Sequence, residues 1–462
     1  MTAQKMEKAL FGTNGVRGVV GEDMTPALSL KIGMALGSEV RGTVAVGRDT
    51  RTSGESLGAA LKAGLMACGC DVLDVGILPT PALQFLVRGR CKGGAMITAS
   101  HNPPQYNGVK VIAEDGTEMG DEDTVRIEQR ILHDRYTHVT WQQVGTEMRS
   151  PALVEEYIRG ILQQFPADMA RDLIVAVDPG SGAGAHTTPA ILSRLGCRAL
   201  TINATLDGTF PGRLPEPSPE GLKDLAALVT AAKAAFGAAH DGDADRTVFI
   251  DDQGRYVEEN KEFALIAQSL CRERKGILVM PVSTSTLVEE IARSCGCEVE
   301  YTPVGSIYVA RRMIELQAQG AKVVMGGEGN GGLIYPRHQF CRDGAMTAAT
   351  MAWILVATGK PLSTLIDQLP QYTMIKEKIS TPYSHAVLKN LDAVFAEERL
   401  DRTDGLKIIR DHAWALVRAS GTEPLIRIMV ESNRREIAED LCREVREAVE
   451  TALRSAEKSQ SS

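Results

Sequence analysis

Short apolar runs and amphipathic stretches alternate along the chain, and one arrangement of them recurs three times. In its first copy, an apolar run at 44–49 precedes a stretch at 53–67 whose apolar and small residues share one helical face. A second apolar run follows at 71–75. Copies that begin at 173–178 and 277–282 repeat the order, with a Gly-Cys pair between helix and second strand. Two matching units would not exclude chance resemblance, but three predict related α/β domains.

The pattern changes beyond about residue 372. Apolar runs at 406–409, 413–418 and 425–430 are typical of antiparallel strands. A long helix is predicted at 434–453, followed by a polar, frayed tail. These elements predict a smaller α+β domain, so we expect an α/β protein of four domains. The domains are expected to span residues 1–150, 151–252, 253–370 and 371–462.

Composition narrows the function classes. The chain of 462 residues carries 59 acidic and 51 basic side chains, and no basic stretch indicates nucleic-acid binding. We see neither a membrane span nor a signal peptide, so a cytoplasmic protein without nucleic-acid or membrane partners is expected. The nine cysteines are then reduced thiols. The Cys-Gly-Cys sequences at 68–70 and 295–297 are interpreted as small core residues rather than metal ligands.

The sequence Thr-Ala-Ser-His-Asn-Pro-Pro at 98–104 lies between two apolar runs. Its prolines cannot continue a helix or a ladder, so they stiffen the loop and can hold one hydroxyl in place. Ser100 is the candidate nucleophile, with His101 beside it and Lys110 in the next predicted strand. Taken alone, the loop is also compatible with an ordinary turn that carries a surface serine.

Three carboxylates alternate in the loop Asp241-Gly-Asp243-Ala-Asp245-Arg246. Such carboxylates can converge on one hard cation, and ligation by oxygen alone favours Mg²⁺. An EF-hand loop does not fit, because its sixth position is Arg246 instead of Gly and no helix follows at once. A solvated acidic turn is the remaining alternative.

The sequence at 326–332 is almost entirely glycine. With so little side-chain bulk, a ligand could approach the backbone while Glu328 and Asn330 reach for its hydroxyl groups. The loop lacks the Gly-Lys-Ser/Thr of a Walker A motif, and the strand after it does not fit a dinucleotide fingerprint. A plain flexible turn is the alternative.

A fourth loop lies between two predicted strands of the last domain. Arg418, Ser420 and Thr422 bring one guanidinium and two hydroxyls together, with Gly421 in the turn and Arg427 nearby. With the backbone N–H groups of the turn, they form a compact cradle suited to a phosphate. A tight hairpin without a ligand is the alternative.

In order and spacing these four loops resemble those of the α-D-phosphohexomutase family, and the resemblance covers essentially the whole chain. The loop at 98–104, with Asn107-Gly108-Val109-Lys110 after it, and the loop at 241–246 are the most specific motifs. The resemblance implies three α/β domains with mixed sheets and a smaller fourth domain around a central cleft. It also implies an intramolecular phosphotransferase that uses a phosphoserine.

The resemblance assigns roles to residues of this chain. Ser100 would carry the phosphoryl group, and one of its oxygens would bind Mg²⁺ together with Asp241, Asp243 and Asp245. Lys110 and His101 resemble family positions that are used in proton transfer and phosphate stabilisation. Arg17, in the glycine-rich opening at 11–18, resembles one that contacts the moving group. The positions that would bind the substrate are Glu328, Asn330, Arg246, Arg418, Ser420, Gly421, Thr422 and Arg427, with 302–306 orienting the sugar.

The opening and the third loop look most like those of archaeal phosphoglucosamine mutases. This implies conversion of glucosamine 6-phosphate to glucosamine 1-phosphate, with a hexose 1,6-bisphosphate as activator. A phosphomannomutase or phosphoglucomutase is the alternative, and a Mg²⁺-dependent phosphatase or a non-catalytic sugar-phosphate sensor would be a different class. Bacterial members often have Ser and His where this chain has Asn330 and Gly332, so no general base is assigned. A monomer or homodimer that binds a small sugar phosphate is expected.

Overall fold

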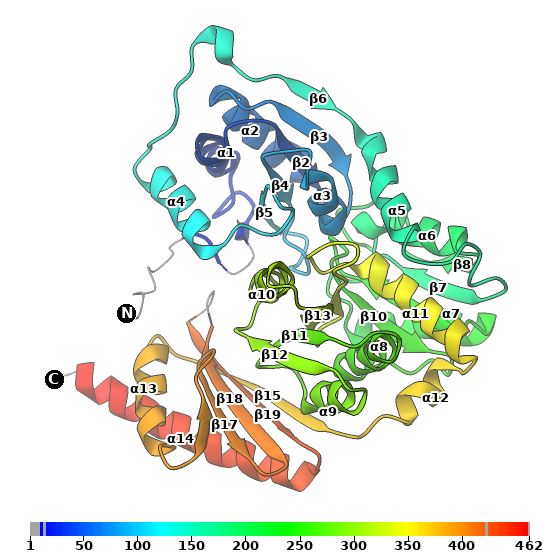
Figure 1. Ribbon diagram of the computed structural model, residues 1–462. Coiled ribbons are helices and arrows are strands. Elements are labelled where there is room, and N and C mark those ends of the chain that lie inside the picture. The colour runs from blue at the N-terminus through cyan, green and yellow to red at the C-terminus, as the bar shows by residue number, and fades with distance from the viewer. Residues whose placement is uncertain (1–9, 13–14, 421–423, 461–462) are drawn as a thin grey trace.

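The computed structural model describes residues 10–12, 15–420 and 424–460, and there the chain forms four sheets (Figure 1). The first sheet contains β1 (Val16–Val19), β2 (Val44–Arg48), β3 (Val72–Ile77), β4 (Gly93–Ile97), β5 (Tyr106–Ala113) and β6 (Glu147–Arg149). Their order is β1-β5-β4-β2-β3-β6, and β5 is antiparallel to both of its neighbours. The helices are α1 (Pro26–Val40), α2 (Gly54–Ala67), α3 (Thr80–Val87) and α4 (Asp121–Leu132). One core contains α1, α2 and α4, and α3 belongs to another.

The second and third sheets repeat this arrangement with four strands each. The second contains β7 (Ile174–Asp178), β8 (Arg198–Thr201), β9 (Phe236–His240) and β10 (Thr247–Asp251). The third contains β11 (Ile277–Pro281), β12 (Glu298–Thr302), β13 (Val323–Glu328) and β14 (Gly332–Ile334). The orders are β10-β9-β7-β8 and β14-β13-β11-β12, which match β5-β4-β2-β3 of the first sheet. In these orders the strand written first, β10, β14 or β5, is the antiparallel one.

Helices and short turns connect these strands. The second and third domains use α5 (Val154–Leu162), α6 (Thr188–Arg194), α7 (Lys223–Ala232), α8 (Glu259–Glu273), α9 (Thr286–Ser294), α10 (Ser306–Ala318), α11 (Gly344–Thr358) and α12 (Leu362–Asp367). Short 3-10 helices are η1 (Trp141–Gln143), η2 (Pro151–Leu153), η3 (Ala183–His186) and η4 (Pro219–Leu222). Three related α/β domains with mixed sheets are therefore confirmed.

The repeated Gly-Cys pair ends a helix in every copy. Gly69, Gly196 and Gly296 have φ values of 85°, 101° and 75°, the left-handed conformation that glycine adopts without strain. Each glycine N–H and the following cysteine N–H bond carbonyls of the last helical turn, for example Gly69 to Met66 and Cys70 to Leu65. This is the Schellman arrangement, with the cysteine as its apolar residue. All nine cysteines are free thiols, as predicted, and only Cys295 is not fully buried.

The fourth sheet is antiparallel throughout. It contains β15 (Thr373–Ser380), β16 (Arg399–Asp401), β17 (Leu406–Arg410), β18 (Ala413–Ala419) and β19 (Leu425–Ser432), in the order β15-β19-β18-β17-β16. Helices α13 (Ser384–Val394) and α14 (Arg435–Gln460) share a core with it. The predicted frayed tail after residue 454 is wrong, because α14 continues to Gln460. Small apolar residues, Ala452 and Ala456, extend its buried face beyond Val445 and Val449.

The cores determine how the domains are joined. One apolar cluster runs through the first three domains, from Ala45 to Leu369, whereas the fourth domain has its own. A small cluster of Val282, Trp414 and Leu416 joins the fourth domain to the third. Within the described ranges, no helix has the length and apolar character needed to cross a membrane.

His338 lies in the shared core, where the first and third domains meet. Its ring stacks on Phe85 of α3 at 5.0 Å between centroids, and Nε2 lies 3.6 Å from Asp343 Oδ2. Burial, and then the charge of Arg88, lower the pKa of His338 to about 3. In the unfolded chain, the imidazole of His338 takes up a proton with the ordinary pKa of about 6.5, whereas in the folded protein it stays neutral at that pH. Its contribution to stability is therefore complete above about pH 6.5 and is lost as the pH falls towards about 3.

We therefore expect acidification to destabilise the wild type more than the His338→Gln variant, which cannot take up that proton. Between about pH 7 and about pH 5, the excess loss should be about 2 kcal/mol. Urea unfolding followed by fluorescence at both pH values measures it. Equal losses in the two proteins would contradict this role of His338.

Candidate active site

Ser100 lies in the hairpin between β4 and β5. Its side chain is buried, and Oγ donates a hydrogen bond of 2.7 Å to Asp241 Oδ2 in the second domain. The residue has a φ of 51°, in the left-handed region that non-glycine residues rarely occupy. Such strain persists only where the surroundings hold the backbone, and it is concentrated at functional sites. The loop thus aims the Ser100 hydroxyl across a domain boundary.

Arg51 holds this hairpin, although no pattern in the sequence singled it out. Its side chain is fully buried. Nη2 donates to the carbonyls of Ser100 and Asn102 at 2.8 and 2.6 Å, and Nη1 donates to those of Pro103 and Tyr106 at 2.7 and 2.9 Å. A planar guanidinium can satisfy four carbonyls in this way, which a lysine cannot. The loop is therefore stiffened by this fork as well as by its prolines.

Asp49 completes the support of the loop. Its Oδ2 accepts from Arg51 Nε at 3.1 Å and from Thr98 Oγ1 at 2.6 Å. The same Thr98 hydroxyl accepts from the N–H of Ser100 at 2.9 Å. The backbone on both sides of the Ser100 side chain is thus fixed by a buried charge pair.

The three aspartates lie in the equivalent hairpin of the second domain, between β9 and β10. All are buried, and one oxygen of each lies within 4.8 Å of the others. Lys110 Nζ, from β5, donates to Asp243 Oδ2 at 2.7 Å and to Asp245 Oδ2 at 3.2 Å. Burial opposes the charge of Lys110, but these two carboxylates raise its pKa, so the ammonium stays protonated.

This donor set fits a hard divalent cation. Asp243 Oδ1 and Asp245 Oδ1 are buried without a hydrogen-bond partner. Burial, together with the Asp245 carboxylate, raises the pKa of Asp241 to about 7. A cation bound by three carboxylate oxygens would satisfy the free oxygens and favour the ionised form of Asp241. In the described part of the chain, this is the one cluster of three or more His, Cys, Asp or Glu side chains placed to hold a metal.

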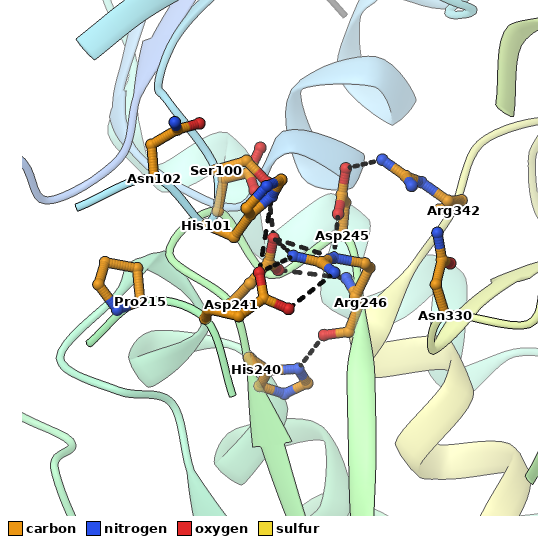
Figure 2. A network of polar contacts seen from close by, with 12 residues as sticks. Ser100, His101, Asn102, Pro215, His240, Asp241, Asp245, Arg246, Asn330 and Arg342 are labelled. Carbon is orange, nitrogen blue, oxygen red and sulfur yellow. Dashed lines mark hydrogen bonds and ion pairs between the residues drawn. The ribbon is translucent and has the colours of Figure 1, made fainter. Parts of the chain in front are cut away.

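Arg246 and His101 flank the contact between Ser100 and Asp241 (Figure 2). Arg246 Nη2 lies 3.3 Å from Asp241 Oδ2 and 3.0 Å from Glu216 Oε2. His101 Nδ1 lies 3.4 Å from Ser100 Oγ. Partial burial, and then the charge of Arg246, lower the pKa of His101 to about 4, so its ring is neutral near pH 7. A neutral imidazole beside a hydroxyl can accept a proton.

The third loop joins the site through Arg342, a second residue that the sequence did not indicate. Glu328 ends β13, and its Oε2 accepts from Asn330 Nδ2 at 3.3 Å and from Arg342 Nη1 at 3.1 Å. Arg342 Nη2 reaches Asp245 Oδ2 at 2.7 Å. A small pocket beside Asp245 and Arg342 is also lined by Ser306, at the start of α10. The third loop and the acidic loop are therefore neighbours (Figure 2).

Arg17, on β1, also contacts the serine loop. Its Nη1 donates to Asn102 Oδ1 at 3.2 Å, and its Nε is buried without a hydrogen-bond partner. Burial lowers the pKa of Arg17, although Asp243 and Asp245 act in the opposite direction. A buried guanidinium N–H without an acceptor is suited to an anionic ligand.

The fourth loop connects β18 and β19. Gly421 and Thr422 lie outside the described residues. Arg418 and Arg427 face each other in the ladder at the base of the loop, where the N–H of Ser420 donates to the carbonyl of Leu425. The two guanidiniums are thus held on one hairpin, next to the turn.

Asp404 links this hairpin to the third domain. Its Oδ2 lies 3.2 Å from Arg418 Nη2 and accepts from the N–H of Val304 at 3.0 Å. Val304 belongs to the segment at 302–306 that precedes α10. Asp404 therefore connects Arg418 to the segment of the third domain that was expected to orient the sugar.

The comparisons with known proteins agree with this architecture. Models of the phosphoglucomutase/phosphomannomutase family match in order: the α/β/α domains I, II and III at residues 8–138, 155–254 and 258–372, and the C-terminal domain at 375–448. The repeated domains and the pairing of a serine hairpin with an acidic hairpin define a phosphohexomutase. The chain belongs to the phosphoglucomutase/phosphomannomutase family and is an intramolecular phosphotransferase, an isomerase.

Relatives match over nearly their full length. A phosphoglucomutase/phosphomannomutase of Thermococcus kodakarensis is 44% identical over 93% of this chain and 96% of its own. A phosphoglucosamine/phosphogalactosamine mutase of Sulfurisphaera tokodaii is 38% identical over 96% and 99%. Among solved structures, a family protein of Burkholderia thailandensis has a TM-score of 0.85 at 27% identity, covering 96% of this chain and 97% of its own.

We expect Arg51→Lys to lower mutase activity about 100-fold, because the serine loop shifts when the fork that holds its carbonyls is lost. Stability should fall by about 2–4 kcal/mol, since buried carbonyls lose their donors. Steady-state kinetics and thermal unfolding measure the two effects. Arg48→Lys, on the strand before it, is the matched control and should behave as wild type; an Arg51→Lys enzyme with full activity would contradict the role given to Arg51.

Proposed function

We propose that the protein interconverts glucosamine 6-phosphate and glucosamine 1-phosphate through a phosphorylated Ser100. The observation that carries this proposal is the 2.7 Å contact between Ser100 Oγ and Asp241 Oδ2 inside a buried acidic cluster. An ordinary surface serine would lie in water and away from such charge. The burial of both groups favours a hydroxyl that carries a phosphoryl group and transfers it.

The proposed cycle moves one phosphoryl group at a time. Phospho-Ser100 donates to O1 of glucosamine 6-phosphate: the bond from phosphorus to Ser100 Oγ breaks as the bond from phosphorus to O1 forms, and the proton lost by the O1 hydroxyl is in net taken up by Ser100 Oγ. The bisphosphorylated sugar then turns in the cleft. The bond from phosphorus to O6 breaks as Ser100 Oγ takes that phosphoryl group, and the Ser100 proton is in net passed to O6, which leaves glucosamine 1-phosphate and restores the phosphoserine.

Residues of the chain supply the charge that this transfer needs. Asp241, Asp243, Asp245 and a phosphoserine oxygen would hold Mg²⁺, which neutralises the developing charge on the phosphoryl oxygens. Lys110 lies at hydrogen-bond distance from two of those aspartates, and we place it at the same phosphoryl group. Phosphoryl transfer is mainly positioning and charge neutralisation, so a cation site with cationic side chains around it suits the step.

Other residues would bind and orient the sugar. We propose that Arg17, His101 and Arg246 contact the reacting end, and that Glu328 and Asn330 bind hydroxyl groups. The phosphate at the far end would be held by Arg418, Ser420, Gly421, Thr422 and Arg427. The same residues of the fourth loop would hold whichever end of the bisphosphate is not reacting.

The relatives support the choice of sugar. Proteins described as probable phosphoglucosamine mutase, such as that of Methanopyrus kandleri at 40% identity, support glucosamine phosphate. The Thermococcus relative supports the second candidate, a phosphoglucomutase/phosphomannomutase. An intact nucleophile and acidic cluster argue against a non-catalytic sensor. A phosphatase would differ by releasing inorganic phosphate and ignoring added hexose bisphosphate.

A hexose 1,6-bisphosphate would serve as activator, because an enzyme that loses its phosphoserine stays inactive until it is recharged. An N-acetylphosphoglucosamine mutase of Aspergillus fumigatus was crystallised with glucose 1,6-bisphosphate, although at 13% identity it supports only the fold. We place the reaction in the cytoplasm, where nine free thiols would stay reduced. The oligomeric state, monomer or homodimer, stays a prediction.

We expect intact mass to rise by one phosphoryl group when the dephosphorylated protein meets glucose 1,6-bisphosphate, and not to rise in Ser100→Ala. Ser38→Ala, which changes a buried serine of α1, is the matched control and should be labelled.

With Mg²⁺, turnover should be fastest on glucosamine phosphate, followed by glucose phosphate and mannose phosphate. Equal labelling of Ser100→Ala would remove Ser100 from the mechanism, faster turnover of another sugar would favour the second candidate, and release of inorganic phosphate without isomerisation would indicate a phosphatase.

A further inference from the structure

Gly332, the first residue of β14, has no room for a side chain. A Cβ at this position would lie 2.4 Å from Arg342 Cδ and 3.0 Å from Arg342 Cγ. Its backbone does not require glycine, because Gly332 is not among the residues with positive φ. The neighbouring side chain, and not the conformation of the chain, therefore excludes a larger residue here.

Arg342 cannot easily move away from Gly332. Its side chain is 7% exposed, and its guanidinium is held at both ends, by Asp245 at 2.7 Å and by Glu328 at 3.1 Å. The atoms nearest to Gly332 are in the middle of the Arg342 side chain, so shifting them would pull on both ion pairs. The backbone is also tied, since Arg342 forms a bridge with Ile334 of β14.

We propose that Arg342 is a positioning residue of the transfer reaction, and that Gly332 is small so that Arg342 can pass it and clamp Asp245 to Glu328. The inference rests on the proposed function, in which Asp245 faces the cation and Glu328 faces the sugar. It adds that one guanidinium fixes both carboxylates, and that positions 332 and 342 act as a unit.

The charges in the site are consistent with a clamp. Asp245 uses Oδ2 for Arg342 and Lys110. Its buried Oδ1 has no hydrogen-bond partner and lies 3.9 Å from Arg246 Nε, so it can serve as a ligand of the cation. Burial opposes ionisation of Asp245, but Arg342 and then Lys110 lower its pKa far below the usual range. A planar guanidinium can bond two carboxylates in fixed directions, whereas a lysine ammonium is a point charge. Two ion pairs in fixed directions therefore require an arginine at position 342, and a lysine with the same charge would not form both.

The test is a double-mutant cycle with Gly332→Ala, Arg342→Ala and the double variant, assayed on whichever hexose phosphate the wild type turns over fastest. Gly332→Ala alone should lower kcat/KM about 100-fold, since it displaces the clamp. In the Arg342→Ala background, the same change should cost less than about threefold, because the collision is gone. Gly120→Ala is the control: Gly120 has a φ of -70° and no atom within 4 Å of the added Cβ.

A second measurement separates positioning from collapse of the loop. Calorimetric titration of the dephosphorylated proteins with Mn²⁺ should show affinity in Arg342→Ala that is equal to or tighter than in wild type. Removal of a positive charge beside the cation favours cation binding, while kcat falls. Arg342→Lys should recover only part of kcat, because it can keep one of the two ion pairs.

The outcomes distinguish this inference from the proposed function. Additive effects of the two substitutions, a Gly332→Ala enzyme as active as Gly120→Ala, or loss of Mn²⁺ binding together with activity would overturn the clamp. If another hexose phosphate is the better substrate, the sugar assignment fails, but the double-mutant cycle is interpreted in the same way with that substrate. If no hexose phosphate is turned over, the proposed function fails, and the clamp is then judged by labelling of Ser100 from glucose 1,6-bisphosphate in the same four proteins.

Discussion

The buried carboxylates of the acidic loop require compensation, and the architecture is arranged to supply it. Three aspartates from the second domain meet a lysine and a serine from the first and an arginine from the third. Charges this deeply buried are stable only when they are paired or bind a metal. The site therefore exists only when the three domains are packed together, and their shared apolar core provides that packing.

A repeated fold explains how these groups come together. In each α/β domain, the chemically important loop is the hairpin that leads from a parallel strand into the single antiparallel one. Equivalent loops of three copies thus meet at one place, each with different side chains. The fourth domain has its own core and meets the third through the small cluster of Val282, Trp414 and Leu416 and through Asp404, which accepts from the N–H of Val304. The hairpin that carries Arg418 and Arg427 is therefore joined to the third domain by apolar as well as polar contacts.

Local patterns in the sequence were enough for the strands of the three repeats, the Gly-Cys helix ends and the loops with Ser100 and the aspartates, but not for the short strands β1, β6 and β16. They did not reveal Arg51 or Arg342, because each acts on loops far from it in sequence and lies in no distinctive motif. Arg51 follows a strand as many surface arginines do, and only the fold shows that it is buried under the Ser100 loop. The end of α14 was misjudged because alanines that continue an apolar face resemble those of a fading helix.

The central claim is that one oxygen, Ser100 Oγ, gives away a phosphoryl group and then takes back another. A single-turnover experiment tests it most directly, with enzyme whose phosphoserine carries ¹⁸O and substrate whose phosphate does not. The account predicts that the ¹⁸O-labelled phosphoryl group leaves with the product, and that Ser100 ends with the unlabelled group of the substrate. Product that keeps its own phosphate, while the label stays on the enzyme, would contradict it.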